Sequence, residues 1–148
     1  MYVQSEYRLE VPYRGQNTIA YTLVKGGYSR LGWTISDRSF PQGERYDDEI
    51  ITIKLLSSKG HALSTPRCLD EMKKKRFRPA NLAELLCLGY NHPSLLSEFF
   101  IVSLAPGSAP LSQYGRAPII SQWQSKPLVY LSSCLPLRWR GRFQFAAV

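Results

Sequence analysis

The sequence has few of the side chains from which enzyme and metal sites are usually built. It contains two histidines, His61 and His92, and neither has a second ligand at a spacing typical of a metal site. There is no G-x-S-x-G segment, no Walker loop and no G-x-G-x-x-G segment, the motifs of common hydrolase, nucleotide and dinucleotide sites. We therefore expect no metal, no cofactor and no catalytic residue, and a binding protein is favoured over an enzyme.

Two polar features could be binding sites but also have a purely structural interpretation. The carboxylates at residues 47–49 are oxygen ligands of the kind that a hard cation prefers, but a run without a spaced partner is also typical of a solvated strand start. His92 precedes Pro93, which favours a turn over a ligand role. Neither feature is taken as a site.

Cysteine is scarce as well. The three cysteines, Cys68, Cys87 and Cys134, are an odd number and lie far apart in the sequence. Cys68 and Cys87 fall inside predicted helices among apolar neighbours, where a thiol behaves as a small apolar side chain. The pattern predicts reduced structural thiols rather than a disulfide or a metal site.

Long apolar runs are missing. No run approaches the roughly 20 residues that a helix needs to cross a bilayer. The first ten residues lack the charged start and apolar block of a secretory signal. We expect a cytoplasmic protein that does not contact membranes, and its 148 residues match a single domain over residues 1–148.

Acidic residues are missing from the end of the chain, since none follows Glu98. Residues 1–60 hold eight Lys or Arg and seven Asp or Glu, whereas residues 61–148 hold eleven and four. The first part thus carries +1 and the second +7 of the net charge of +8. This asymmetry indicates an anionic partner for the second half of the chain.

Alternating apolar and polar residues predict strands toward both ends of the chain. Residues 6–13 alternate in this way, and Pro12 favours an edge position for that strand. Residues 18–24 alternate as well, so the two segments are expected to form an antiparallel hairpin. Further strands are expected at residues 31–35, 50–56, 99–104, 119–123, 128–131 and 135–148, with Gly141 as a bend in the last. Residues 37–48 are expected to be a surface loop.

The first of two capped helices is predicted over residues 66–75. Thr65 and Pro66 suit an N-cap and a first helical position, because proline lacks the amide hydrogen that a helix start leaves unpaired. Pro79 disfavours helical geometry at Arg78 and ends the helix. Lysines lie in its last turn, where the helix dipole favours positive charge.

The second helix begins after Asn81. Asn81 and Glu84 make a capping-box pair, and Gly89 is expected at a left-handed C-cap. Leu85 and Leu86 belong to an apolar stripe that we expect to be fully buried. A further helical turn is expected within residues 92–97.

The same stretch carries a resemblance. It consists of RPANLAELL at residues 78–86, followed by Gly89, Pro93, Leu96, Phe99 and the IVSL run at residues 101–104. The segment resembles a pattern in small uncharacterised bacterial proteins and covers about a quarter of the chain. The resemblance implies a bacterial or phage origin, and no activity comes with it.

Two basic segments with aromatic neighbours are candidate binding sites. Residues 73–78 form a positive block that suits phosphates but equally suits a solvated helix end. In residues 137–145, a strand with period two would place three arginines on one face and the aromatic residues on the other, in the core. Three like charges in a row repel, so they need either cross-strand acids such as Glu10 or an anion. The arginine fork matches phosphate, so this face is the stronger candidate. The loop at residues 105–118 is expected to be a functional or mobile arm, and Tyr114, Arg116 and Trp123 are expected to provide an arginine and a stacking surface.

We therefore predict an α+β fold: a mostly antiparallel sheet from both chain ends, with two or three short helices of residues 66–97 on one face. The function predicted is binding of nucleic acid or nucleoprotein through the arginine face. The alternative is a protein-interaction module, such as a bacterial or phage regulator, that docks on an acidic protein surface. The predicted nucleic-acid contacts are Lys73, Lys74, Lys75, Arg76, Arg78, Arg116, Arg138, Arg140 and Arg142, with Tyr114 and Trp123 as stacking candidates.

Overall fold

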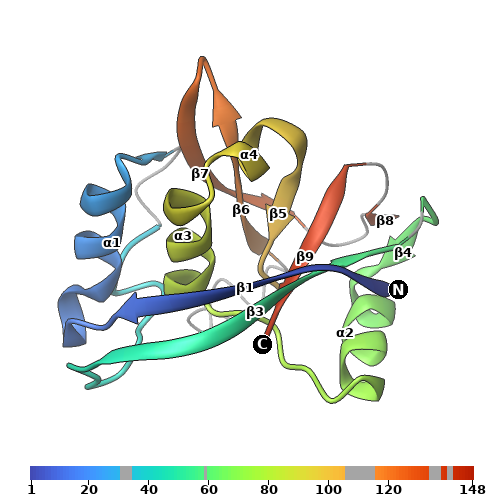
Figure 1. Cartoon of the computed structure of the whole chain (residues 1–148), viewed down its shortest axis with the longest axis horizontal. Helices are drawn as coiled ribbons and strands as arrows, with labels where there is room; N and C mark the ends of the chain where they lie inside the picture. Colours follow the sequence, from blue (N-terminus) through green and yellow to red (C-terminus); the bar gives the residue numbers. More distant parts are fainter. Residues whose placement is uncertain (31–34, 59, 106–115, 134–137, 140–141) are drawn as a thin grey trace.

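A seven-stranded mixed sheet forms the centre of the molecule (Figure 1). The computed structural model describes residues 1–30, 35–58, 60–105, 116–133, 138–139 and 142–148. In spatial order the strands are β1 (Tyr2–Pro12), β3 (Asp48–Ser57), β9 (Phe143–Ala147), β5 (Phe100–Val102), β6 (Arg116–Trp123), β7 (Lys126–Ser133) and β2 (Ser29–Arg30). The β5–β9 and β2–β7 pairs are parallel and the other pairs are antiparallel. The two ends of the chain meet in this sheet, because β1 and β9 flank β3.

Four α-helices and a small second sheet complete the described structure. The helices are α1 (Thr18–Gly26), which follows the 3-10 turn η1 (Gly15–Asn17), then α2 (Thr65–Lys74), α3 (Leu82–Asn91) and α4 (Ser94–Glu98). The second sheet pairs β4 (Leu63–Ser64) with β8 (Arg138–Trp139). No described helix has both the length and the apolar character needed to span a membrane.

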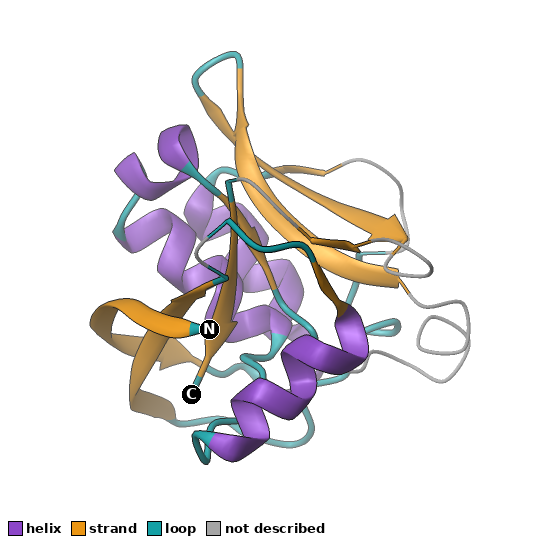
Figure 2. Cartoon of the chain, turned by 90° about the vertical axis from the view of Figure 1, so that its right-hand side faces the viewer, coloured by secondary structure: helices purple, strands orange, loops and turns teal. Residues whose placement is uncertain are grey.

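Each face of the large sheet packs against a buried apolar cluster. Neighbouring residues on a strand point to opposite faces, and Leu55 and Leu56 accordingly belong to two different core clusters. The larger cluster joins one face to α1, α3 and α4, and it includes Leu85 and Leu86, both fully buried as expected. The smaller cluster joins the other face to α2 through Cys68 and Met72. Figure 2 shows α2 as the helix nearest the viewer, apart from the other three.

The predicted fold class is confirmed, and its helices are distributed over both faces. The α+β architecture, the mostly antiparallel sheet and the strands expected near residues 6–13, 50–56, 99–104, 119–123 and 128–131 are all present. The helices of residues 66–97 were expected on one face, which is wrong: α3 and α4 cover one face, and α2 covers the other through Cys68 and Met72. Pro12 lies at the end of an edge strand, as expected.

The strand predicted at residues 18–24 is wrong, because this segment is α1. Its buried residues Thr18, Ile19, Thr22 and Leu23 follow the helical period, whereas Tyr21 is 39% exposed. The side chain of Asp37 accepts hydrogen bonds from the backbone N–H groups of Ile19 and Ala20 at 2.7 and 3.0 Å, and so satisfies the start of the helix. With residues 18–24 helical, β1 pairs with β3 and the expected hairpin does not form.

Gly89 was expected at a C-cap and instead lies inside α3. A Cβ atom at this position would lie 2.0 Å from the hydroxyl oxygen of Tyr28, which donates a hydrogen bond to the backbone oxygen of Leu86 at 2.7 Å. Glycine is therefore needed for the close approach of Tyr28, and the helix continues to Asn91.

Other expectations fall largely outside the described residues. These are the strand at residues 31–35, of which only Ile35 is described and is not in a strand, and the arm at residues 105–118, of which residues 106–115 are not described. The end of that arm, residues 116–118, belongs to β6 rather than to a loop. Residues 37–47 form the expected loop.

Candidate nucleic-acid interface

The C-terminal end of α2 is the most exposed basic segment of the described structure. The N-cap of the helix is Ser64, one residue before the expected Thr65. The Oγ of Ser64 accepts a hydrogen bond from the N–H of Arg67 at 3.3 Å. Cys68 and Met72, one helical turn apart, are fully buried against the sheet and fix the helix there. The opposite side of its last turn therefore faces solvent.

The chain leaves α2 through a Schellman motif. The N–H of Phe77 donates to the backbone oxygen of Met72 at 2.9 Å, and the N–H of Arg76 donates to that of Lys73 at 3.0 Å. Arg76 has a φ of 61°, in the left-handed region where glycine is the usual residue. Phe77 and Met72 pack in the same core cluster, the apolar contact that accompanies this motif. The backbone of the turn is thus held by buried groups.

We call residues 73–76 the basic turn. Its four side chains, Lys73, Lys74, Lys75 and Arg76, are all exposed. One of them has an ion-pair partner among the described residues: Lys74 Nζ lies 3.6 Å from Glu71 Oε1, and the Lys74 side chain remains 74% exposed. An exposed pair of this kind contributes little to stability and is screened by salt. The basic turn therefore presents a concentrated positive charge to solvent.

Arg78, two residues further on, has a different environment. Its guanidinium donates to both carboxylate oxygens of Glu84 at 2.8 and 2.7 Å, and the Glu84 side chain is 1% exposed. The hydrogen bonds to Glu84 raise the pKa of Arg78 above its ordinary value. Its backbone exchanges hydrogen bonds with Val148 at 2.9 and 2.8 Å. Arg78 was predicted to contact phosphate; in the structure its guanidinium pairs with a buried carboxylate, and its side chain is 51% exposed.

One more basic group, for which no local sequence pattern gave a signal, lies beside the basic turn. Lys54 of β3 places its Nζ 4.8 Å from the centre of the Phe77 ring. The pairing of Lys54 with Ala147, and of residues 78–80 with the end of β9, brings the two segments together across the sheet. The proximity of Lys54 to residue 77 depends on pairing between strands that are distant in the sequence.

The arginine face predicted for residues 137–145 does not exist as one strand. Residues 138–139 form β8 in the small sheet, whereas β9 begins at Phe143 in the large sheet. A period-two argument applies only within a single strand, so the three arginines share no strand face. Arg140 lies outside the described residues, and Arg138 is described in its backbone alone. Phe145 is fully buried, as its predicted core position requires.

Arg142, the third member of that face, bonds within the chain. Its Nε donates to the backbone oxygen of Glu98 and its second guanidinium nitrogen to that of Ser97, both at 2.6 Å. These are carbonyl groups at the C-terminal end of α4, where a positive charge also favours the helix dipole. The guanidinium carbon lies 5.8 Å from the centre of the Phe100 ring. Arg142 thus has a structural role as a helix cap.

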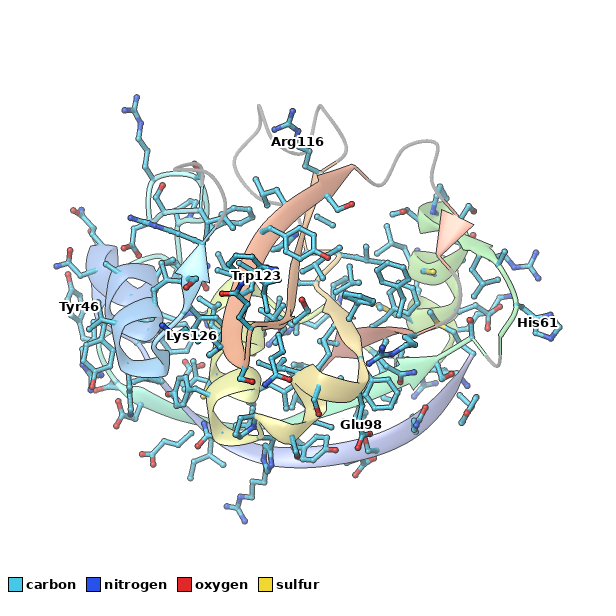
Figure 3. All side chains as sticks on the ribbon, turned by 90° about the horizontal axis from the view of Figure 1, so that it is seen from above. Tyr46, His61, Glu98, Arg116, Trp123 and Lys126 are labelled. Atoms are coloured by element: carbon cyan, nitrogen blue, oxygen red, sulfur yellow. The ribbon has the colours of Figure 1, made fainter. Side chains whose placement is uncertain are left out.

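The remaining predicted contacts are dispersed. Figure 3 shows Arg116 and Trp123 at opposite ends of β6, and both lie apart from α2. Both side chains are exposed, Trp123 by 62%. Tyr114 lies outside the described residues. The structure therefore brings together Lys73, Lys74, Lys75 and Arg76, adds Lys54 to them, and separates Arg116, Arg142 and Trp123 from them.

The two described cysteines, Cys68 and Cys87, are fully buried. Burial raises the pKa of the Cys68 thiol to about 12, and it raises the pKa of Cys87 as well. Cys68 and Cys87 are buried free thiols, and burial disfavours the thiolate that a nucleophile or metal ligand needs. Cys134 lies outside the described residues. The described part of the chain has no cluster of three or more His, Cys, Asp or Glu side chains able to hold a metal ion.

One cavity at the start of α3 is polar, and its buried polar groups already have partners. It has a volume of about 430 Å³ and is lined in part by Arg45, Asn81 and Ser103. The amide nitrogen of Asn81 donates to the Tyr13 hydroxyl at 3.0 Å, and Ser103 Oγ donates to the backbone oxygen of Ala80. Neither of these two groups would need a small molecule to satisfy it.

No family model matches the chain, and no curated protein or solved structure matches it at a significant level. The resemblance noted for residues 78–104 therefore stays a prediction. What the function rests on is the geometry of the described surface.

Proposed function

We propose that the protein binds nucleic acid through the basic turn, residues 73–76, with Lys54 at its margin. The observation that carries the proposal is Arg76. A residue other than glycine in the left-handed region costs roughly 1 kcal/mol, and the Arg76 side chain makes no hydrogen bond or ion pair among the described residues. A strained backbone with an exposed charged side chain is typical of a functional position.

The chemistry of the basic turn suits a phosphate backbone. Lysine supplies point charges that contact phosphates without reading sequence, and arginine adds a bidentate fork. Several cations on one short turn release several counterions at once, which gives affinity that falls steeply with salt. The binding proposed is thus electrostatic and does not depend on a particular base sequence.

The test is a salt titration of binding to a labelled oligonucleotide, single- and double-stranded. We expect the parent to bind with a log affinity that falls linearly with log salt. The double variant Lys73→Gln/Lys75→Gln should make the slope shallower by about 0.7 to 0.9 for each phosphate that the variant no longer neutralises. The double variant Arg116→Gln/Arg142→Gln, which removes the same charge elsewhere, should change the slope less. Equal effects of the two double variants would contradict the proposal, and so would a parent that binds no oligonucleotide at low salt.

A second candidate function is docking on an acidic protein surface, and the tip of the β6–β7 hairpin favours it. Trp123 and Lys126 lie opposite each other in the register, and both are exposed. Gln124 and Ser125, which join them, have positive φ values of 50° and 63°. Hairpin turns with positive φ usually contain glycine or asparagine, so this tip also holds strain beside an exposed aromatic side chain.

The two functions respond to different variants. If the hairpin docks on a protein, Trp123→Ala should abolish that association and leave oligonucleotide binding unchanged. The variants of the basic turn should do the reverse. Weaker oligonucleotide binding by Trp123→Ala would show instead that the hairpin belongs to the nucleic-acid surface.

A further inference from the structure

The two edges of the large sheet differ greatly in length. At one edge β2 has two residues, which leaves little open backbone. At the other edge β1 has eleven residues, and in Figure 3 it runs along the outer margin of the molecule with no other described element beyond it. A long edge strand presents a row of N–H and C=O groups to any strand that can pair with it.

Partial protection of this edge leaves its centre open. Pro12 blocks pairing at one end, and a register irregularity between Val3 and Ser5 disturbs the other. Between them residues 5–11 pair regularly with β3 and contain neither proline nor glycine. The remaining protection is charge, supplied by Glu6, Arg8 and Glu10, which are all exposed.

These three charges are self-complementary. In antiparallel pairing of β1 with a second β1, a two-fold axis at Tyr7 places Glu6 opposite Arg8 of the other copy, and does so twice. An axis at Leu9 likewise places Arg8 opposite Glu10 twice. An axis at Arg8 opposes like charges throughout and is disfavoured. Each complementary register is isologous, so that it closes as a dimer.

Arg8 faces no charge within its own sheet, because it lies opposite Thr52 in the β1–β3 register. Glu6 lies opposite Lys54 in the same register. Among the described residues neither Glu6 nor Arg8 has an ion-pair partner within salt-bridge distance. Opposite charges directly across a strand pair are stabilising, and like charges are destabilising.

We propose that β1 pairs antiparallel with β1 of a second copy of this chain, in a register that sets Arg8 against a glutamate of that copy. The two seven-stranded sheets then continue into one sheet across the two-fold axis. The apolar side of β1, including Leu9 and Val11, stays covered by α3 in each copy. This dimer is independent of the basic turn, which lies on a different element.

The first test is the mass of the protein by analytical ultracentrifugation from micromolar to millimolar concentration. We expect the parent to double its mass over this range. Arg8→Glu should weaken the dimer by about tenfold or more, since two attractive pairs become repulsive. Arg38→Glu is the matched control, because it makes the same charge change on an exposed loop residue and should leave the dimer intact. A parent that stays monomeric, or an Arg8→Glu variant that dimerises like the parent, would overturn the proposal.

A mixing experiment then identifies the register. The Arg8→Glu chain should form a heterodimer with a Glu6→Lys chain if the axis lies at Tyr7, and with a Glu10→Lys chain if it lies at Leu9. Each single variant alone should be mostly monomeric in the matching register. Circular dichroism checks that every variant is folded. Failure of both mixtures to restore the dimer would contradict β1 pairing even if the parent dimerises.

Discussion

The basic turn at residues 73–76 and the C-terminal segment at residues 138–142 are both short, basic and next to aromatic residues, yet their charges are used differently. In the basic turn, backbone hydrogen bonds and the packing of the partly buried Phe77 with the buried Met72 fix the backbone, and the cations are exposed. In the C-terminal segment, the guanidinium of Arg142 bonds to the end of α4. A positive segment is a candidate for binding where the backbone, rather than the charged groups, makes the internal contacts.

The same contrast separates Arg76 from Arg78, two residues apart. Arg78 forms an ion pair with the buried carboxylate of Glu84, and its side chain is 51% exposed. Arg76 occupies a costly backbone conformation and extends into solvent. The two arginines belong to the same basic run of the sequence, but only Arg78 has an ion-pair partner among the described residues. Arg78 therefore stabilises the fold, whereas the Arg76 side chain is exposed to a ligand.

The largest expected effect comes from removing the buried anchor of the basic turn. Met72→Ala should lower the free energy of unfolding by roughly 2 to 5 kcal/mol, because it leaves a cavity between α2 and the sheet. Urea denaturation measures this change. Leu69→Ala, on the more exposed side of the same helix, should cost much less. Equal costs would show that the anchor does not hold the turn.

The next effect concerns Arg78. Arg78→Gln should lower the free energy of unfolding by about 1 to 3 kcal/mol, since it leaves the buried carboxylate of Glu84 without its bidentate partner. The double variant Arg78→Gln/Glu84→Gln should recover part of this stability in a double-mutant cycle. The oligonucleotide affinity of the single variant should stay close to that of the parent. A drop in affinity as large as that of Lys73→Gln/Lys75→Gln would place Arg78 in the binding surface after all.

A smaller effect is expected at Arg142. Arg142→Gln removes two hydrogen bonds to carbonyl groups at the end of α4 and should cost below about 1 kcal/mol, as this site is exposed. Thermal unfolding measures the destabilisation, and Arg116→Gln is the control at an exposed strand position. A larger effect on oligonucleotide binding than on stability would restore Arg142 as a phosphate ligand.

Local patterns predicted the segments whose information lies close together in sequence. The capping box of Asn81 and Glu84 forms with both hydrogen bonds at 2.8 Å. The strand around Ile53 follows its alternation, and the strand around Ile101 is a continuous apolar run in which Ile101 and Val102 are buried. These features depend on residues at most a few positions apart. These features can therefore be predicted without knowledge of the tertiary structure.

The predictions failed where contacts with residues distant in the sequence determine the local structure. The helix at residues 18–26 is capped by Asp37, and Gly89 is required by Tyr28, neither of which a local window contains. Likewise, the alternation at residues 137–145 could not show that β8 and β9 join different sheets. Within the candidate site, the basic character of residues 73–76 was readable, but the internal partners of Arg78 and Arg142 were not.

The central claim is that the Arg76 side chain contacts a nucleic acid. Measuring both stability and binding in the Arg76→Gly variant tests this claim most directly. Glycine relieves the left-handed conformation, so the free energy of unfolding should rise by about 0.5 to 1 kcal/mol, while oligonucleotide affinity falls and its salt slope becomes shallower by the equivalent of about one phosphate. Arg76→Lys should keep both properties near those of the parent. A more stable Arg76→Gly variant that binds as tightly as the parent would contradict the claim.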